Sequence, residues 1–275
     1  MTGSADAIVV LNAGSSSIKF STFRRAGRAL KRELRGQVSG LGTVPRLTAK
    51  RGGAPIVDRT LSAEGLGHAE ALDILLEFVR AELHGEVLAG VGHRVVHGGL
   101  EFMEPTRVDA AILERLARYV PLAPLHQPHN LAPIRAIAAR MPAMPQVACF
   151  DTAFHRGQPP VAQAFALPKE ITDRGVIRYG FHGLSYEYVA SVLPALDARA
   201  ASGRTVVFHL GNGSSMCALE AGRSVATTMG FTAMDGLPMG TRTGAMDPGV
   251  LLFMFDELGM SVREVDHLLY HESGL

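Results

Sequence analysis

Two glycine- and serine-rich turns, each directly after a short apolar stretch, are the parts of this sequence best suited to chemistry. The first occupies residues 12–17 (NAGSSS) and the second residues 209–215 (HLGNGSS). Gly14 corresponds to Gly211, an offset of 211 − 14 = 197 residues. Backbone N–H groups and serine hydroxyls at such turns donate hydrogen bonds to phosphate oxygens. The repeat predicts two halves that each hold phosphate, and hence phosphoryl transfer, whereas two ordinary hairpin turns are the alternative.

Arg94 lies near the end of a predicted strand over 87–96, within the segment GHRVVHGG. Strand alternation places Val96 on the same face as Arg94. A guanidinium group holds both oxygens of a carboxylate, and an apolar neighbour would receive the alkyl end. This pair predicts a small carboxylate as a substrate, whereas a structural ion pair of Arg94 with a nearby acid is the alternative.

Four more polar residues lie in loops or where predicted elements end, namely His126, Asp151, His182 and Arg242. An Arg on a glycine-flanked loop is suited to stabilising a transferring phosphoryl group, although a solvated loop Arg is the alternative. A single His is more often a structural residue than a catalytic one, so both interpretations stay open for the two histidines. The chain lacks an HExxH spacing and a GxSxG elbow, which disfavours a tight zinc site and a Ser-His-Asp hydrolase.

Composition limits the size and the partners of the protein. A chain of 275 residues with 47% apolar residues predicts about two domains with sizeable cores. Charged residues make up 19% and the net charge is +1, which argues against nucleic acid or a membrane surface as the main partner. Cys149 and Cys217 lie far apart in apolar stretches, which predicts buried core residues. Without a leader or an apolar run near the roughly 18 residues of a membrane span, we expect a cytoplasmic protein.

Periodicity and turn signals predict alternating strands and helices. Besides a hairpin over 7–23, strands are expected at 34–39, 55–61, 87–96, 146–150, 206–210 and 214–219. Helices are expected at 69–83, 109–119, 131–140, 184–196, 248–258 and 261–270. Asp109 is a predicted N-cap, and Ser261 with Glu264 forms a predicted capping box. The segment 227–249 is expected to be a long functional loop.

Seven segments, in order along the chain, closely resemble the acetate kinase family: NAGSSSIKF, GHRVVHGG, PLAPLHQPHN, CFDTAFH, YGFHGLSYEYV, HLGNGSS and GTRTG. The resemblance implies an α/β protein with the duplicated actin-like (ribonuclease H-like) ATPase fold, in which two domains flank a cleft. These domains are expected at residues 1–150 and 151–275, the second incomplete at its C-terminal end. The resemblance also implies phosphoryl transfer from ATP to acetate, dependent on Mg²⁺ or Mn²⁺, giving acetyl phosphate and ADP, in a homodimer.

The same resemblance implies a role for each matching residue. Asn12 matches the magnesium-associated residue, and the catalytic residues match Asp151, His182 and Arg242. The carboxylate substrate would be bound by Arg94, Val96, Leu125, His126 and Phe181. The ATP phosphates would be bound by Ser15, Ser17, Lys19, His209, Leu210, Gly211, Asn212 and Gly213.

The role of Asp151 follows from the acidity of the substrate. Carboxylic acids titrate near ~4, so acetate is already ionised at pH 7 and needs no base before it attacks phosphorus. Asp151 is therefore expected to orient a Mg²⁺-bound water rather than to remove a proton.

Two substitutions and the length depart from the family pattern. Ala233 stands where the family usually has Pro near the methyl pocket, which predicts better acceptance of propionate. Ala245 stands where members commonly carry an acid, and nothing explains that change. Acetate kinases continue well past the position of Leu275, so the alternatives are a truncated non-catalytic fragment, an acyl-phosphate- or anion-binding relative, or a propionate-preferring kinase. A sugar kinase or chaperone-like ATPase of the same fold is disfavoured, because Arg94 suits a carboxylate.

Overall fold

The computed structural model describes residues 6–27, 29–62 and 65–275. The chain divides into two compact units. Unit 1 comprises Met1–His97 and Glu104–Cys149, and unit 2 comprises Gly98–Met103 and Phe150–Leu275. The cleft expected between two domains stays a prediction.

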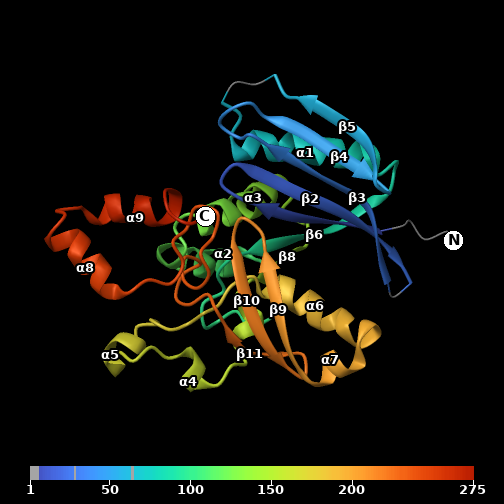
Figure 1. Ribbon diagram of the computed structural model, residues 1–275. Helices are drawn as coiled ribbons and strands as arrows, with labels where there is room; N and C mark the ends of the chain where they lie inside the picture. Colours follow the sequence, from blue (N-terminus) through green and yellow to red (C-terminus); the bar gives the residue numbers. More distant parts are fainter. Residues whose placement is uncertain (1–5, 28, 63–64) are drawn as a thin grey trace. The chain divides into compact units, whose positions relative to one another are not determined.

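Unit 1 is built on a large mixed sheet (Figure 1). Its strands are β1 (Asp6–Ala13), β2 (Ser17–Ala26), β3 (Ala29–Ser39), β4 (Arg46–Arg51), β5 (Ala54–Thr60), β6 (Val87–Val95), β7 (Thr106–Arg107) and β8 (Gln146–Phe150). Their order in the sheet is β5-β4-β3-β2-β1-β6-β8-β7. The strands β1 to β5 form an antiparallel meander, and β6 pairs parallel to β1. The parallel pair requires a crossover, which α1 (His68–Glu82) supplies.

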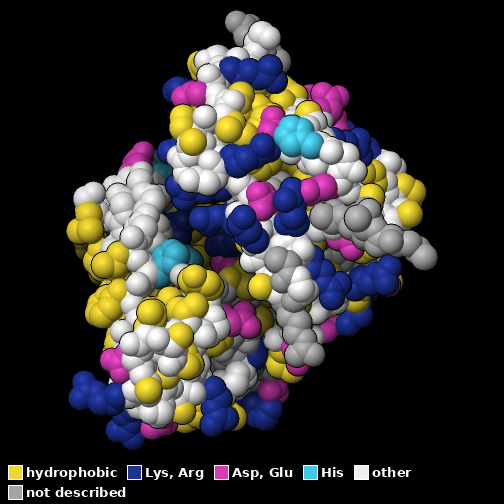
Figure 2. All heavy atoms as spheres, turned by 90° about the vertical axis from the view of Figure 1, so that its right-hand side faces the viewer, with side chains coloured by type: hydrophobic (Ala, Val, Ile, Leu, Met, Phe, Trp, Pro, Cys, Tyr) yellow, Lys and Arg dark blue, Asp and Glu magenta, His cyan; other side chains and the backbone are white. Residues whose placement is uncertain are grey.

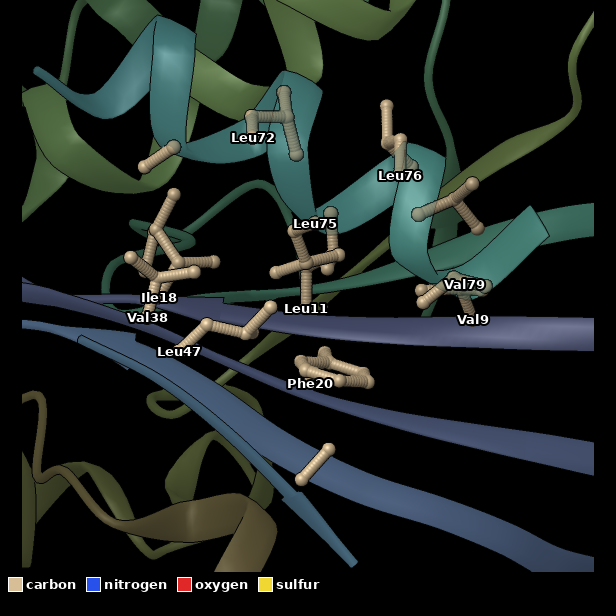
Figure 3. Close-up of a cluster of buried hydrophobic side chains, with 14 of the residues drawn as sticks. Val9, Leu11, Ile18, Phe20, Val38, Leu47, Leu72, Leu75, Leu76 and Val79 are labelled. Carbon is tan, nitrogen blue, oxygen red and sulfur yellow. The ribbon is translucent and has the colours of Figure 1, made fainter. Parts of the chain in front are cut away.

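Helix α1 covers one face of this sheet with a row of leucines (Figure 3). The core between helix and sheet contains Val9, Leu11, Ile18, Phe20, Val38, Leu47, Leu72, Leu75, Leu76 and Val79, all nearly inaccessible to solvent. Burying a side chain of this size stabilises the fold by about 1.5–3 kcal/mol. Because side chains alternate along a strand, burying Leu11 turns its neighbour Asn12 to the opposite face of the sheet.

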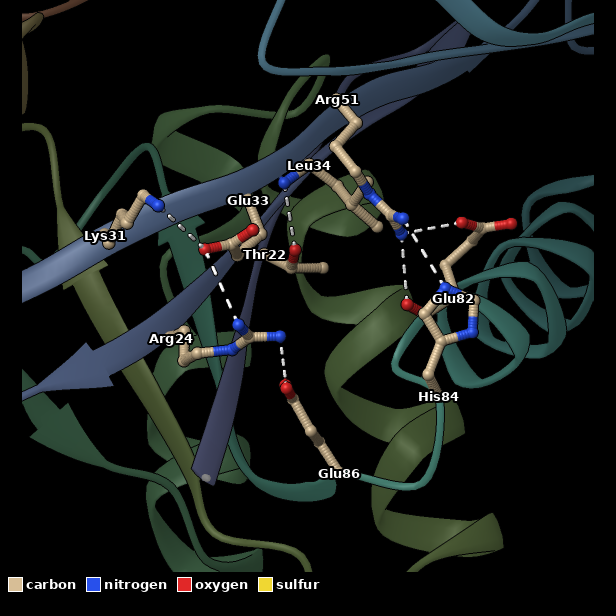
Figure 4. Close-up of polar contacts among 9 residues, drawn as sticks. All are labelled: Thr22, Arg24, Lys31, Glu33, Leu34, Arg51, Glu82, His84 and Glu86. Atoms are coloured by element: carbon tan, nitrogen blue, oxygen red, sulfur yellow. Dashed lines mark hydrogen bonds and ion pairs between the residues drawn. The ribbon is translucent and has the colours of Figure 1, made fainter. Parts of the chain in front are cut away.

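Ion pairs connect the C-terminal end of α1, and the segment after it, to the meander (Figure 4). Arg51 of β4 donates to both the carbonyl and the carboxylate of Glu82, at 3.1 and 2.7 Å. A positive charge at a helix C-terminus is favourable, because it lies beside the unpaired carbonyls there. Arg24 of β2 contacts Glu86, which lies just before β6. These contacts fix the position of the chain where it enters β6.

Two more helices complete unit 1. Helix α2 (Ala110–Ala117) begins at Asp109, whose carboxylate accepts from the backbone N–H of Ile112 at 2.8 Å, so the predicted cap is confirmed. After a 3-10 turn at Val120–Leu122, helix α3 (Gln127–Arg140) follows. It begins four residues before the predicted start at 131, because Pro128 lies in its first turn, where proline is tolerated.

Unit 2 contains a three-stranded antiparallel meander. Its strands are β9 (Arg204–Leu210), β10 (Ser214–Glu220) and β11 (Arg223–Thr227), in the order β11-β10-β9. Its helices are α4 (Pro160–Gln163), α5 (Lys169–Thr172), α6 (Gly183–Leu196), α7 (Ala198–Ser202), α8 (Pro248–Asp256) and α9 (Val262–His271), with a 3-10 turn at Ala153–His155. The capping box of Ser261 and Glu264 is present at the start of α9, as predicted.

The structure corrects three expectations. Strands β4 and β11 were not predicted, because each is stabilised by pairing with its neighbours rather than by a strong apolar pattern of its own. Strand β3 begins at Ala29, five residues before the predicted start. Cys217 is fully buried, but Cys149 is only partly buried, so the expectation that both cysteines are buried core residues is wrong for Cys149.

Within the described residues, no helix is long and apolar enough to cross a membrane. Figure 2 shows basic, acidic and hydrophobic side chains interspersed on the face that it presents. That mixture agrees with the net charge of +1.

Candidate active site

His182 lies in a left-handed backbone conformation immediately before α6, with φ 60° and ψ 18°. Residues other than glycine rarely adopt this conformation, so the surrounding contacts must hold it. The N–H of Gly183 donates to the carbonyl of Asp151 at 2.8 Å. A Cβ atom at Gly183 would overlap that same carbonyl oxygen. Close packing of these two backbone segments therefore places His182 beside Asp151, which is itself 2% exposed.

The second glycine-rich turn, between β9 and β10, brings His182 and Arg242 together. A Cβ atom built on Gly213 would lie 3.5 Å from His182 Nε2 and 3.6 Å from Arg242 Nη1. Gly211 and Gly213 do not have positive φ, so the turn does not need glycine for its backbone conformation. The glycine at 213 instead leaves open the space that both nitrogens face.

Arg242 is held by the long loop that precedes α8. Its Nη1 donates to the carbonyl of Ala233 at 2.9 Å. The N–H of Gly240 donates to the carbonyl of Asn212 at 3.2 Å, which joins this loop to the turn. Burial lowers the pKa of the Arg242 guanidinium, and nearby Tyr270 opposes that shift. A guanidinium nonetheless stays charged in proteins, so Arg242 brings a positive charge to the turn.

His209 stacks against His182. The ring centroids are 4.0 Å apart and the planes differ by 21°. His182 Nδ1 bonds to Ser215 Oγ at 2.8 Å, and His209 Nδ1 bonds to Ser185 Oγ at 2.9 Å. Two imidazoles and a guanidinium thus gather at one turn, an arrangement suited to an anion such as phosphate.

Unit 1 carries a second set of polar side chains. Asn12 of β1 lies directly opposite Lys19 of β2, so their side chains share one face of the sheet. Arg94 of β6 donates from Nη1 to Asn12 Oδ1 at 3.2 Å. Lys19, Asn12 and Arg94 therefore form a row across three neighbouring strands, on the face opposite the α1 core.

Helix α3 and helix α1 position the strand ends that carry this row. Asn130 donates from Nδ2 to the carbonyl of Ala13 at 2.7 Å and accepts from the N–H of Val96 at 2.8 Å. Gln127 bonds to both the N–H and the carbonyl of His97. His68 Nε2 bonds to the carbonyl of Gly14 at 2.7 Å. The ends of β1 and β6 are thereby fixed relative to each other.

Comparisons with known proteins agree with these motifs. The sequence model of the acetokinase family matches residues 7–275. The acetate kinase of Nitrobacter hamburgensis is 51% identical over 273 residues, which cover 98% of this chain and 67% of that protein. The acetate kinase of Rhizobium meliloti is 49% identical over 271 residues, covering 98% and 69%. The chain belongs to the acetokinase family.

Solved structures of acetokinase-family proteins share the fold. A propionate kinase from Francisella tularensis aligns with a TM-score of 0.90 and 35% identity, covering 98% of this chain and 69% of that one. The acetate kinase of Porphyromonas gingivalis aligns with a TM-score of 0.84 and 32% identity, with the same coverage. The predicted α/β fold of the actin-like ATPase type is confirmed. The chain spans about two thirds of the length of these relatives.

The predicted site residues of this acetokinase-family chain fall into two groups. Unit 2 brings together His182, His209, Gly211, Asn212, Gly213 and Arg242, and joins Asp151 to them through the backbone. Unit 1 brings together Asn12, Lys19 and Arg94. Leu210 ends β9 with its side chain 73% exposed. In the first turn, the N–H of Gly14 donates to the carbonyl of Ser17 at 2.8 Å, while Ser15 is exposed.

The predicted methyl-pocket residues are divided between the units. Val96 and Phe181 are buried, at 4% and 2% exposed, and Leu125 is 38% exposed. His126 lies at the start of α3 without capping it through its side chain. Since Phe181 belongs to unit 2 and the others to unit 1, their shared pocket stays a prediction.

Sequence reasoning missed the residues that orient the site. Ser215, Ser185 and Tyr186 bond to the site histidines or to each other, and Asn130 joins β1 to β6. The signal that could have found Ser215 is its place directly after the glycine-rich turn. For Asn130 the signal is an amide in the first turn of a helix that follows a loop rich in proline.

Proposed function

We propose that this chain is an acetate kinase, which transfers the γ-phosphoryl group of ATP to acetate and gives acetyl phosphate and ADP. Family membership supports the reaction class. The observation that carries the proposal is the approach of His182 Nε2 and Arg242 Nη1 to the open side of Gly213. That geometry supplies two donors where phosphoryl oxygens would gain charge.

The chemistry follows from charge. Acetate attacks the γ-phosphorus as an ionised carboxylate, and the bond from that phosphorus to the bridging oxygen of ADP breaks. A negatively charged nucleophile must approach a negatively charged phosphate, so electrostatic stabilisation supplies most of the catalysis. Arg242 and His182 would donate to the equatorial phosphoryl oxygens. Arg94 would hold the carboxylate through its guanidinium group.

Mg²⁺ belongs to the proposal as an ion that accompanies ATP. The described residues contain no group of three or more His, Cys, Asp or Glu that could hold a metal ion. Mg²⁺ usually keeps several waters and binds substrate phosphates with only one or two protein ligands. The Asp151 carboxylate and the Asn12 amide oxygen would be those ligands, directly or through water. The ion would neutralise phosphate charge during transfer.

The proposed role of Asp151 has its own test. With Asp151→Asn, we expect activity to fall and the Mg²⁺ concentration that gives half-maximal activity to rise, because the variant lacks the charge that orients the hydrated ion. Loss of activity with an unchanged Mg²⁺ requirement would refute this role.

Trapping acetyl phosphate with hydroxylamine tests the reaction itself. The full chain is incubated with ATP, Mg²⁺ and acetate, and acetyl hydroxamate is measured. We expect Arg242→Ala to lower kcat by about 10²–10³-fold, the usual effect of removing one transition-state donor. Arg223→Ala, which changes an exposed Arg of β11 in the same unit, is the matched control. Equal activity of Arg242→Ala and the native chain would contradict the proposal.

Propionate is the second candidate substrate. Ala233, whose carbonyl anchors Arg242, is smaller than the Pro usual in the family, and the propionate kinase of Francisella tularensis shares the fold. One methylene changes discrimination by only about 1–3 kcal/mol. We expect Ala233→Pro to lower kcat/KM for propionate more than for acetate. A strong native preference for acetate, unchanged in the variant, would exclude a role for Ala233.

A non-catalytic anion-binding protein is the other alternative. Calorimetry separates it from a kinase, because such a protein would bind acetyl phosphate or ATP without forming hydroxamate. The proposal also includes a cytoplasmic location, where ATP is available, and a homodimer.

A further inference from the structure

A buried chain of hydrogen bonds runs from Tyr186 through Ser215 to His182. Tyr186 lies one helical turn after His182 in α6, and Ser215 lies in β10 just after the glycine-rich turn. Ser215 Oγ bonds to the Tyr186 hydroxyl and, at 2.8 Å, to His182 Nδ1. Both Tyr186 and Ser215 are fully buried. The catalytic proposal for His182 makes no use of these two hydroxyl groups.

The direction of each bond follows from the protons available. Burial raises the pKa of Tyr186 to about 12, so the phenol keeps its proton at neutral pH. Ser215 Oγ is the hydrogen-bond partner of that hydroxyl among the described residues, and a buried phenol proton directed elsewhere would be unsatisfied. Tyr186 therefore donates to Ser215. The proton of Ser215 is then directed to the other partner of its hydroxyl within the described part of the chain, His182 Nδ1.

A neutral imidazole carries one proton, on either Nδ1 or Nε2. If Nδ1 accepts from Ser215, the proton of a neutral His182 must lie on Nε2. That nitrogen faces the space beside Gly213, together with Arg242 Nη1.

We propose that Tyr186 and Ser215 are positioning residues, which hold His182 in the Nε2–H tautomer so that a neutral imidazole donates to a phosphoryl oxygen at the Gly213 turn. The opposite tautomer would place a lone pair toward that oxygen and repel it. Other groups near the ring favour the neutral form, because the Arg242 guanidinium and the stacked His209 both disfavour a second positive charge. Asp151, whose carbonyl accepts from Gly183, is an acidic neighbour of this segment, and a carboxylate favours an imidazolium. The effect on transfer rests on the proposed acetate kinase activity, but the tautomer does not.

The first test leaves Tyr186 and Ser215 unchanged and does not depend on enzymatic activity. Nitrogen-15 NMR of the histidine side chains in the full native chain, without nucleotide and above neutral pH, separates protonated from unprotonated ring nitrogens. His182→Gln assigns the signal. We expect a protonated Nε2 and an unprotonated, hydrogen-bonded Nδ1. A protonated Nδ1, or an even mixture of the two tautomers, would overturn the proposal.

The second test removes the hydroxyl groups one at a time. Ser215→Ala deletes the donor to Nδ1, so we expect a mixture of tautomers at His182 and a kcat about 10-fold lower, with the KM for ATP within about twofold. Tyr186→Phe keeps Ser215 but removes the phenol that directs the Ser215 proton toward His182 Nδ1. We therefore expect a smaller loss of kcat and a smaller shift toward mixed tautomers. Because Tyr186→Phe keeps the buried ring, it still tests the proposal if Ser215→Ala does not fold.

Ser185→Ala is the matched control. It removes the equivalent serine from His209 and should alter the His209 signals while leaving the tautomer of His182 unchanged. If both Ser215→Ala and Tyr186→Phe retain the native tautomer and kcat, the proposal is wrong. If the native chain forms no hydroxamate but its His182 shows the Nε2–H tautomer, the positioning role stands and the proposed function fails.

Discussion

His182 is the residue at which local strain and the candidate chemistry coincide. Close packing of the two neighbouring glycines holds the backbone of His182 in its left-handed conformation. Gly180 packs against the ring of His155, and Gly183 packs against the carbonyl of Asp151. A side chain at either glycine would collide with those groups. Strained residues that the surroundings hold in place are common at active sites, where a fixed direction of one side chain matters.

Gly213 offers a test of the anion site. In Gly213→Ala the new methyl group would lie at ordinary contact distance from His182 Nε2 and Arg242 Nη1, so the fold should be unchanged. The methyl would occupy the space in which an oxygen would meet both donors. We therefore expect the KM for ATP to rise by at least about 10-fold, or kcat to fall by a similar factor, with Tm unchanged.

Gly157→Ala is the control for that substitution, because it adds a methyl group in unit 2 where nothing lies within 4 Å. It should leave both the kinetics and Tm unchanged. Native kinetics in Gly213→Ala would show that no substrate oxygen occupies that space.

The segment before α6 is held by a network that joins three elements. His155, at the end of a 3-10 turn, donates from Nε2 to the carbonyl of Phe181 at 3.0 Å. Its Nδ1 accepts from Ser224 of β11 at 2.8 Å, and Gln158 donates to the same Ser224 hydroxyl. In a neutral imidazole with the proton on Nε2, Nδ1 is the acceptor, and this arrangement satisfies the network. His155 thus links β11 to the segment that ends at His182.

The burial of His155 predicts that the fold is sensitive to acid. The pKa of His155 is lowered to about 4, mainly by burial and in part by Arg156, while the Phe181 carbonyl and Asp151 oppose the shift. The unfolded chain binds more protons than the folded one between about pH 6.5 and pH 4, so stability falls as the pH is lowered through that window. We expect His155→Gln to reduce the slope of unfolding free energy against pH by up to about 1.4 kcal/mol per pH unit.

Urea denaturation at several pH values measures that slope. Buried His93 of unit 1, whose pKa is likewise lowered to about 4, contributes a similar slope that the substitution leaves in place. His155→Gln would therefore remove part of the acid sensitivity. An unchanged slope would show that His155 is not the group that titrates.

Unit 2 exposes apolar side chains that do not pack into its core. Strand β9 lies at one edge of its sheet and exposes Val206, Phe208 and Leu210 on one face. Helix α8 is strongly apolar but has no buried residue, and Phe253 is 55% exposed. Unpaired apolar edges and patches favour association with another chain. In the expected homodimer, a second copy of this chain would cover this surface.

Light scattering after size-exclusion chromatography tests self-association. We expect the native chain to form a dimer or larger species whose mass rises with concentration, and Phe208→Lys to shift it toward monomer. Val161→Lys replaces an exposed apolar residue of α4, away from β9 in the sequence, and should have no such effect. A native chain that is monomeric at every concentration would refute the expectation.

The elements predicted correctly depend on contacts between residues close in sequence. The hairpin of β1 and β2, the Asp109 cap and the capping box of Ser261 and Glu264 each form within a few residues. Edge and meander strands such as β4 depend on partners brought by other strands, so their own residues show little pattern. The motif residues at the two turns were predicted for the same local reason.

The sequence motifs identified the family through their resemblance to it, and they predicted the phosphate-binding turns and the basic residues that the proposed chemistry needs. Only the tertiary structure decided which atoms orient the side chains of these residues. Ser215 and His182 are separated by 33 residues, and Asn130 and Ala13 by 117, so no local pattern reveals either pair. Hydrogen bonds act over about 3 Å, and only a folded backbone brings such distant groups within that range.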